Sequence, residues 1–148
     1  MLYYMPKIDE TMDTALVELP KLETLLEVNG AENIHFENLT FAYATWSQPS
    51  SDTGYVTDQS GYLITGTDVE YNTVGHVQSV TGTPGNISLQ YVNHIEFRGN
   101  IFEHLGGVAL NFGTGTQNCV IADNLFEDIA SAAINLGGVS ENDYAPND

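Results

Sequence analysis

Apolar and polar residues alternate in two stretches of the chain that are nearly copies of each other. The first, HIEFRGNIFEHLGGVALNFG, begins at His94, and the second, NCVIADNLFEDIASAAINLG, begins at Asn118, so one repeat unit runs from 94 to 117. Within each copy the apolar residues recur at every second position over short runs, which is the pattern of a β-strand. Glycine, asparagine and aspartate separate the runs, and these residues favour turns. Each copy therefore predicts three short strands joined by turns.

The two copies also match along their apolar positions. The matched pairs are Ile95 with Cys119, Phe97 with Ile121, Phe102 with Phe126, Leu105 with Ile129, Val108 with Ala132, Leu110 with Ile134 and Phe112 with Leu136. A unit this short cannot bury its own apolar face, so it must stack on a neighbouring unit. Three strands per unit, stacked in parallel, predict a parallel β-helix in which Cys119 is a small buried residue.

One turn carries an asparagine in both copies, Asn100 in the first and Asn124 in the second. Asparagine can adopt the left-handed backbone conformation of a tight corner, and stacked asparagine side chains can hydrogen-bond as a ladder. The stretch NIHFENLTF, at residues 33–41, repeats the motif with Asn38 in the place of Asn100. The sequence therefore predicts an all-β fold, a parallel β-helix of about three coils.

The first of these coils lies much farther from the next than one repeat unit, since its Ile34 corresponds to Ile95. We place the extra residues in two long rim loops, insertions at about 43–59 and 67–86, on either side of a coil strand in SGYLITG. The stretch ISLQY, at residues 87–91, alternates like a strand but has no assigned place in the coil. Loops of this length in a compact domain are usually either functional or disordered.

The chain divides into an N-terminal strand or cap at residues 1–28 and the solenoid at residues 29–148. Leu22, Leu25 and Leu26 follow Pro20 at helical spacing, which favours a short helix before the solenoid. The stretch LLEVNG, at residues 25–30, fits the first strand of the solenoid equally well, and both alternatives stay open. The strand-like MLYYMP at one end and the polar SENDYAPND at the other indicate a fragment of a longer protein.

The composition limits the classes of molecule that the protein can bind. The net charge is −17 with only three basic residues, so the surface repels nucleic acid, anionic membranes and polyanions, while it tolerates neutral ligands. No apolar run approaches the length that a membrane span needs, and a single cysteine allows no internal disulfide or thiolate cluster. No phosphate loop, metal motif or nucleophile elbow is present, so we expect no cofactor and no metal.

The outward positions of the predicted third strands form one row. Thr65, Asn111 and Asn135 are expected to stack about 4.8 Å apart, as neighbouring strands do, and to line a shallow uncharged groove. The loop after Phe41 adds Trp46, Asp58 and Gln59. An aromatic face with amide and carboxylate groups suits a sugar ring. The alternative is that Trp46 only anchors its loop on the coil.

Asp58 and Asp128 are the candidate catalytic acids. His104 precedes Asp128 by one repeat, so the two side chains should be adjacent, where they could share a proton or position a substrate. The alternative is a polar pair in a turn. Glu103 and Glu127 also occupy equivalent repeat positions, and we interpret them as a solvated stripe. The expected substrate-binding residues are Trp46, Gln59, Thr65, His104, Asn111 and Asn135.

Several stretches together resemble bacterial right-handed parallel β-helix proteins of the pectate-lyase-like superfamily. They are LYYMP, NIHFENLTFAYATW, GYVTDQSG, TPGNI, FEHLGGVALNFGTGTQ and IASAAINLGG. Within that superfamily the chain is most similar to large secreted polysaccharide-degrading enzymes related to β-helical fucosidases and xylanases. The resemblance implies a right-handed solenoid, a polysaccharide or oligosaccharide partner, further β-helix coils in a full-length chain, and secretion or a periplasmic location. It indicates fold more strongly than function, because lyases, hydrolases, epimerases and adhesins share this solenoid.

Three functions are compatible with these residues. The first is a glycoside hydrolase acting on a polysaccharide, which needs two carboxylates about 5–5.5 Å or about 6.5–9.5 Å apart. The second is a non-catalytic solenoid that binds carbohydrate or builds a structure. The third, a polyuronate lyase, needs cations beside the substrate carboxylates, and both the net charge of −17 and the single arginine, Arg98, argue against it.

Overall fold

The fold is built from strands arranged around a central core. The computed structural model describes residues 3–52, 62–65 and 79–137 of the chain. Sheet A consists of β1 (Leu26–Asn29), β6 (Gly85–Gln90), β9 (Val108–Phe112) and β12 (Ile134–Leu136). Sheet B consists of β2 (Glu32–Glu37), β7 (Asn93–Arg98) and β10 (Val120–Ala122). Sheet C consists of β3 (Thr40–Ala44), β8 (Ile101–Leu105) and β11 (Leu125–Ile129).

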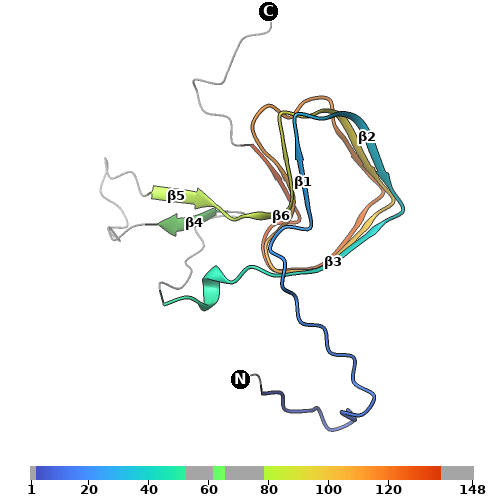
Figure 1. Cartoon of the computed structure of the whole chain (residues 1–148), viewed down its shortest axis with the longest axis vertical. Helices are drawn as coiled ribbons and strands as arrows, with labels where there is room; N and C mark the ends of the chain where they lie inside the picture. The colour runs from blue at the N-terminus through green and yellow to red at the C-terminus, as the bar shows by residue number, and fades with distance from the viewer. Residues whose placement is uncertain (1–2, 53–61, 66–78, 138–148) are drawn as a thin grey trace, which may run out of the picture.

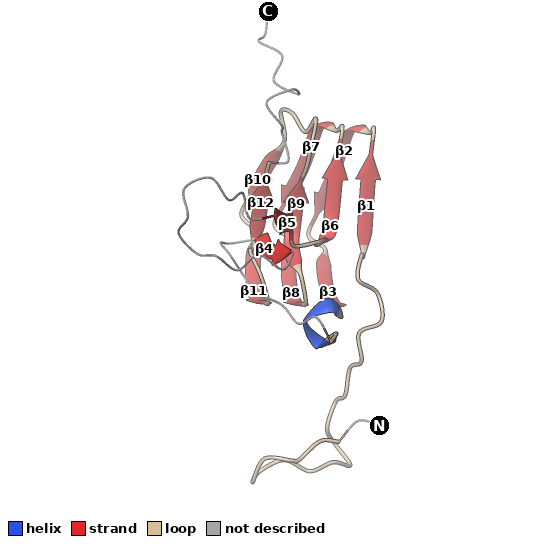
Figure 2. Cartoon of the chain, turned by 90° about the vertical axis from the view of Figure 1, so that its left-hand side faces the viewer, coloured by secondary structure: helices blue, strands red, loops and turns tan. Residues whose placement is uncertain are grey.

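These three sheets form the faces of a right-handed parallel β-helix. Every pair of neighbouring strands within them is parallel. In Figure 1 the chain runs clockwise through β1, β2 and β3, and the later coils lie farther from the viewer, so the helix is right-handed. Figure 2 shows the coils side by side, from β1 at one end of the solenoid to β12 at the other. The predicted fold of about three coils is confirmed.

The register predicted from the repeat is also confirmed. Phe97 pairs with Ile121, and Phe102 pairs with Phe126, each one repeat further along the chain. The earlier coil joins the same columns, since Phe36 pairs with Phe97 and Phe41 with Phe102. Apolar residues that point in the same direction therefore meet along each column, as stacking of similar units requires.

The hydrophobic core is enclosed by the strands that pair with another strand on both sides. The largest fully buried apolar side chains are Ile87, Leu89, Val92, Ile95, Phe97, Phe102, Leu105, Val108 and Leu110, all on or beside β6 to β9. Phe102 stacks between Phe41 and Phe126, with ring centroids 5.1 and 4.8 Å away. Cys119 points toward this core but is only half-buried, since it immediately precedes β10, which is an edge strand. The prediction that Cys119 is buried is therefore only partly met.

The asparagine turn differs from the prediction by one residue. The left-handed position is occupied by Asn38, Gly99 and Asp123, with φ of 55°, 64° and 58°, and not by Asn100 or Asn124. Asn38 is therefore equivalent to Gly99, and the predicted match with Asn100 is wrong. The predicted ladder is confirmed, because Nδ2 of Asn100 donates to Oδ1 of Asn124 over 3.0 Å. The asparagines point inward, where they bind backbone groups of the adjacent coils.

The predicted coil strand in SGYLITG lies outside the solenoid. β4 (Tyr62–Thr65) pairs in antiparallel fashion with β5 (Ser79–Gly82), and this two-stranded sheet projects from the side of sheet A (Figure 1). β6, the ISLQ stretch, takes its place in the coil. Only β6 can do so, because just Tyr91 and Val92 separate it from β7, whereas β4 is followed by a long connection. The two predicted rim loops are thus one excursion between β3 and β6, which also contains the short 3-10 turn η1 (Gln48–Ser50).

At the N-terminal side, β1 is the first strand of the solenoid. Leu26 of β1 pairs with Ile87 of β6, which decides between the two alternatives for LLEVNG. The boundary expected after residue 28, between the N-terminal segment and the solenoid, falls within β1. Residues 3–25 contain no helix or strand, so the predicted short helix is wrong, and the part of this segment before residue 22 extends away from the coils (Figure 2). Of the three leucines at helical spacing, Leu22 is 61% exposed, whereas Leu25 and Leu26 pack on the core of the solenoid in extended backbone.

Candidate functional site

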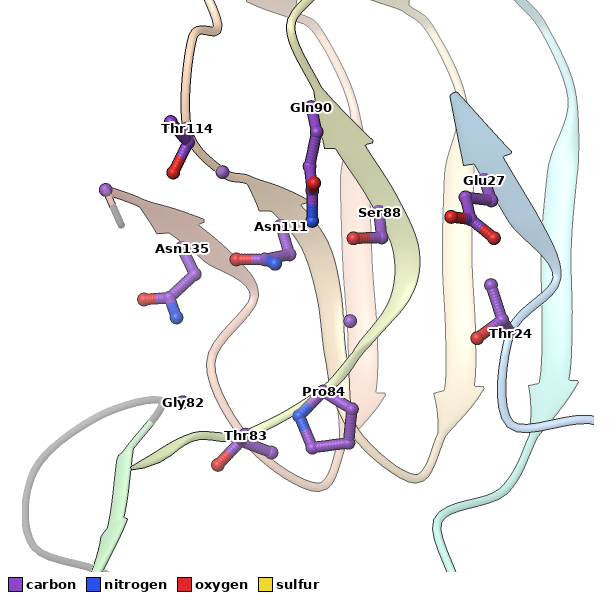
Figure 3. A pocket seen from close by; sticks show the side chains of 13 residues that line it. Thr24, Glu27, Gly82, Thr83, Pro84, Ser88, Gln90, Asn111, Thr114 and Asn135 are labelled. Carbon is purple, nitrogen blue, oxygen red and sulfur yellow. The ribbon is translucent and has the colours of Figure 1, made fainter. Parts of the chain in front are cut away.

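A polar groove runs over the outer face of sheet A (Figure 3). Its volume is about 450 Å³, and its walls are the sheet and the segment at residues 82–85, where the excursion rejoins the coil. The residues that line it are Thr24, Glu27, Gly82, Thr83, Pro84, Gly85, Ser88, Gln90, Asn111, Gly113, Thr114, Asn135 and Gly137. Almost all of them are uncharged, and Glu27 carries the one carboxylate among these lining residues.

One row of side chains crosses the floor of the groove from strand to strand. Glu27 pairs with Ser88, Ser88 with Asn111, and Asn111 with Asn135. Neighbouring strands lie about 4.8 Å apart, so the row presents a polar group at each such step along the solenoid axis. Asn111 and Asn135 lie where the sequence predicts them. Thr65 does not, because it lies on β4 outside the sheet, and Ser88 occupies the position expected for it.

Strand alternation explains why this row faces outward. On β6 the side chains of Ile87 and Leu89 are fully buried, so Ser88 between them must point to the outer face. Gly85 leaves room for the row, because a Cβ at this residue would lie 2.5 Å from the Cβ of Asn111. A larger residue at position 85 would thus displace the groove floor.

Asn86 holds the wall of the groove in place. Its side chain is 1% exposed, and its Nδ2 donates to the backbone carbonyls of Glu23 and Thr45 over 2.6 and 3.1 Å. Its Oδ1 accepts a hydrogen bond from the backbone N–H of Gly107 over 2.8 Å. Asn86 therefore connects the start of the excursion, its end and the corner between sheets C and A.

The predicted loop residues contribute less than expected to the described groove. Trp46 follows β3 and is half-buried, and it is not among the residues that line the groove. Its backbone packs so closely on the corner at residue 106 that a Cβ on Gly106 would lie 2.7 Å from the Trp46 nitrogen. Asp58 and Gln59 lie outside the described residues.

His104 and Asp128 are adjacent, as the sequence predicts, but they lie on sheet C. Nδ1 of His104 is 2.7 Å from Oδ2 of Asp128, and the His104 ring stacks on Tyr43 with centroids 5.1 Å apart. The hydrogen bond with Asp128 raises the pKa of His104 above its ordinary value of 6.5. Neither residue lines the groove over sheet A. This pair is therefore separate from the row of Asn111 and Asn135.

Glu27, Ser88 and Gln90 line the groove and were missed by sequence reasoning. The signal for Ser88 and Gln90 was present, since both are the polar residues of the alternating stretch ISLQ. The alternation predicts groove residues only if ISLQ is a strand of the coil, which the sequence leaves open. Glu27 depends in the same way on whether LLEVNG is a strand of the solenoid.

The chain was compared with family models, curated proteins and solved structures. No family model, curated protein or solved structure matches this chain. Within the described residues, no helix is long and apolar enough to cross a membrane.

Proposed function

We propose that this protein binds a neutral polysaccharide or oligosaccharide in the groove over sheet A. The observation that carries the proposal is the row of Glu27, Ser88, Asn111 and Asn135, which faces a groove of about 450 Å³. Amide and hydroxyl groups can both donate and accept hydrogen bonds, and so can the hydroxyls of a sugar. A row that repeats along the solenoid axis suits a ligand that repeats in the same direction. Further β-helix coils in a longer chain would extend the same row.

Charge supports an uncharged ligand over a polyuronate. Among the described residues that line the groove, Glu27 alone carries a carboxylate, which would repel a uronate, and the net charge of −17 adds to that repulsion. Arg98, the only arginine, lies on sheet B and is paired with Glu96 and Asp123. A lyase mechanism therefore has no support from the groove residues.

A glycoside hydrolase is the second candidate, and Glu27 is the observation that favours it. A hydrolase needs a second carboxylate across the groove. Asp128 cannot supply it from sheet C, and Asp58 lies outside the described residues. Binding without cleavage is therefore the better-supported function of the described groove.

The test combines binding and product analysis. We expect xylohexaose or a fucosylated oligosaccharide, tested by isothermal titration calorimetry, to bind, and polygalacturonate not to bind. Asn111→Ala should weaken binding about fivefold, because one lost hydrogen bond costs about 1 kcal/mol and about 1.4 kcal/mol corresponds to a factor of ten. Thr40→Ala, on the outer face of sheet C, is the matched control and should bind normally.

Each outcome has a clear meaning. If no neutral oligosaccharide binds, or if Asn111→Ala binds as tightly as the unchanged protein, the groove is not the saccharide site. If reducing ends are released and Glu27→Gln abolishes their release while binding persists, the protein is a hydrolase.

A further inference from the structure

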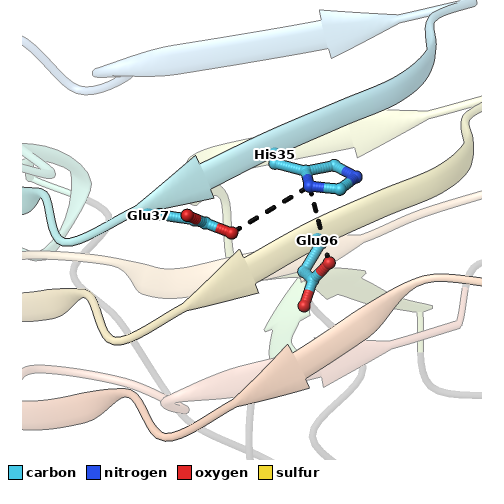
Figure 4. A group of neighbouring side chains, drawn as sticks. All are labelled: His35, Glu37 and Glu96. Atoms are coloured by element: carbon cyan, nitrogen blue, oxygen red, sulfur yellow. Dashed lines mark ion pairs between the residues drawn. The ribbon is translucent and has the colours of Figure 1, made fainter.

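A cluster of three metal-ligating side chains lies on the outer face of sheet B, away from the groove (Figure 4). His35 and Glu37 are on β2, two residues apart, and Glu96 is on β7, directly beside His35 in the register. Nδ1 of His35 is 3.6 Å from Oε2 of Glu96 and 4.0 Å from Oε1 of Glu37. One ligand atom from each of the three residues lies within 4.8 Å of the other two.

We propose that His35, Glu37 and Glu96 form a binding site for a divalent transition metal of the zinc type. Zinc binds imidazole nitrogen at about 2.0–2.1 Å and carboxylate oxygen at about 2.0–2.2 Å. Tetrahedral bonds of that length place the ligand atoms about 3.3 Å apart. His35 Nδ1 lies 3.6 and 4.0 Å from the two carboxylate oxygens, and all three ligand atoms lie within 4.8 Å of one another, so no separation needs to contract by more than about 1.5 Å.

The side chains can make that adjustment without moving the backbone. The side chains of His35 and Glu37 are 57% and 50% exposed, so rotation about their side-chain bonds meets little resistance. Glu96 is 19% exposed and is held by Arg98, whose Nε donates to Oε1 of Glu96 over 2.7 Å. This bond occupies one oxygen of Glu96 and leaves the other, Oε2, turned toward His35. Such a partner behind a ligating carboxylate orients it for the metal.

The ligand set distinguishes zinc-type metals from calcium and magnesium. Calcium takes six to eight oxygen ligands and magnesium prefers oxygen in octahedral geometry, whereas imidazole favours zinc, nickel and copper. Three protein ligands leave the fourth position of a zinc ion to water, as in sites that remain open to a substrate. The net charge of −17 also raises the local concentration of cations at the surface.

An ordinary ion pair is the alternative. A protonated His35 between two glutamates would give similar distances without any metal. The two interpretations differ in what the imidazole must do, because a metal ligand has to be unprotonated, whereas an ion pair needs the proton.

The experiment titrates the protein with zinc alone above pH 7, by calorimetry. We expect one saturable site per chain that calcium does not displace, and a rise in the unfolding temperature on adding zinc, because binding to the folded state stabilises it. His35→Gln and Glu96→Gln should each weaken zinc binding at least tenfold. Glu103→Gln, which removes a carboxylate from sheet C, is the control for loss of one negative charge and should bind normally.

Cobalt gives an independent readout. Cobalt in place of zinc should show visible absorption bands that are lost in His35→Gln and retained in Glu103→Gln. The proposal is overturned if zinc shows no saturable site, if His35→Gln binds as well as the unchanged protein, or if calcium competes equally.

Discussion

At the scale of single residues, left-handed backbone positions shape the coils of this protein. Tyr43, His104 and Asp128 share one column of sheet C, and each has a positive φ, between 52° and 60°. A left-handed residue at this place lets both Phe102 and Leu105 point inward although they are three positions apart. The side chains of the column consequently project from the surface together, which brings His104 against Asp128.

The pKa of His104 depends on its hydrogen bond with Asp128. Asp128→Asn should lower that pKa, because the hydrogen bond with the Asp128 carboxylate is the largest cause that raises it. A raised pKa in the folded state stabilises the fold below the unfolded pKa of about 6.5, and this contribution disappears as the pH rises through the folded value. The free energy of unfolding should therefore differ more between the two proteins near pH 6 than near pH 9.

An NMR titration of the His104 ring measures the shift directly. Glu127→Gln is the matched control, since it removes the same charge from the neighbouring residue, whose effect on His104 is smaller. Equal shifts in the two variants would show that general charge, and not the bond to Asp128, sets this pKa.

At the scale of elements, a strand is stabilised according to how many neighbours it has. β6, β7, β8 and β9 each lie between two strands and carry the fully buried core. β10, β11 and β12 lie at one edge, and their apolar residues are only partly covered. The same residue type should therefore contribute differently in equivalent positions of different coils.

Two phenylalanines of one stack test this expectation. Phe102→Ala should lower the free energy of unfolding by about 3–5 kcal/mol, because Phe102 is fully buried between Phe41 and Phe126. Phe126→Ala should cost less, about 1–2 kcal/mol, because its ring is already partly exposed. Urea unfolding followed by circular dichroism measures both. Equal losses would contradict a core centred on β6 to β9.

At the scale of the whole molecule, the strands at both ends of the solenoid pair on one side only within the part of the chain that the structure describes. β1, β2 and β3 lie at one end of their sheets, and β10, β11 and β12 lie at the other. Leu136 occupies the inward position opposite Phe112 on β12, yet it is 71% exposed. Open edges of this kind are templates for pairing with another chain, while the net charge of −17 opposes the approach of a second copy.

Self-association is therefore expected to depend on concentration and salt. Sedimentation velocity should show end-to-end oligomers that increase with protein concentration, and added salt should favour them by screening the repulsion. Leu136→Lys should reduce association. Leu19→Lys is the matched control, because Leu19 is 67% exposed but lies in the extended N-terminal segment. A monomer under all of these conditions would rule out pairing of the edges.

The sequence by itself determined the repeat, its register and the stacking of the coils. Alternation and a constant interval between matching residues are local properties, and they correctly matched Phe97 with Ile121 and Phe102 with Phe126. They also placed Asn111 and Asn135 in one row and brought His104 to Asp128.

Only the tertiary structure decided which strands complete the coil. YLIT and ISLQ are both plausible strands, and their own side chains do not distinguish them. The short connection from β6 to β7 decides for ISLQ, and it replaces Thr65 by Ser88 in the groove. Strand pairing also places Glu27 in the groove and brings Glu96 beside His35 and Glu37. Residues far apart in the chain become neighbours only through strand pairing, which a local pattern does not contain.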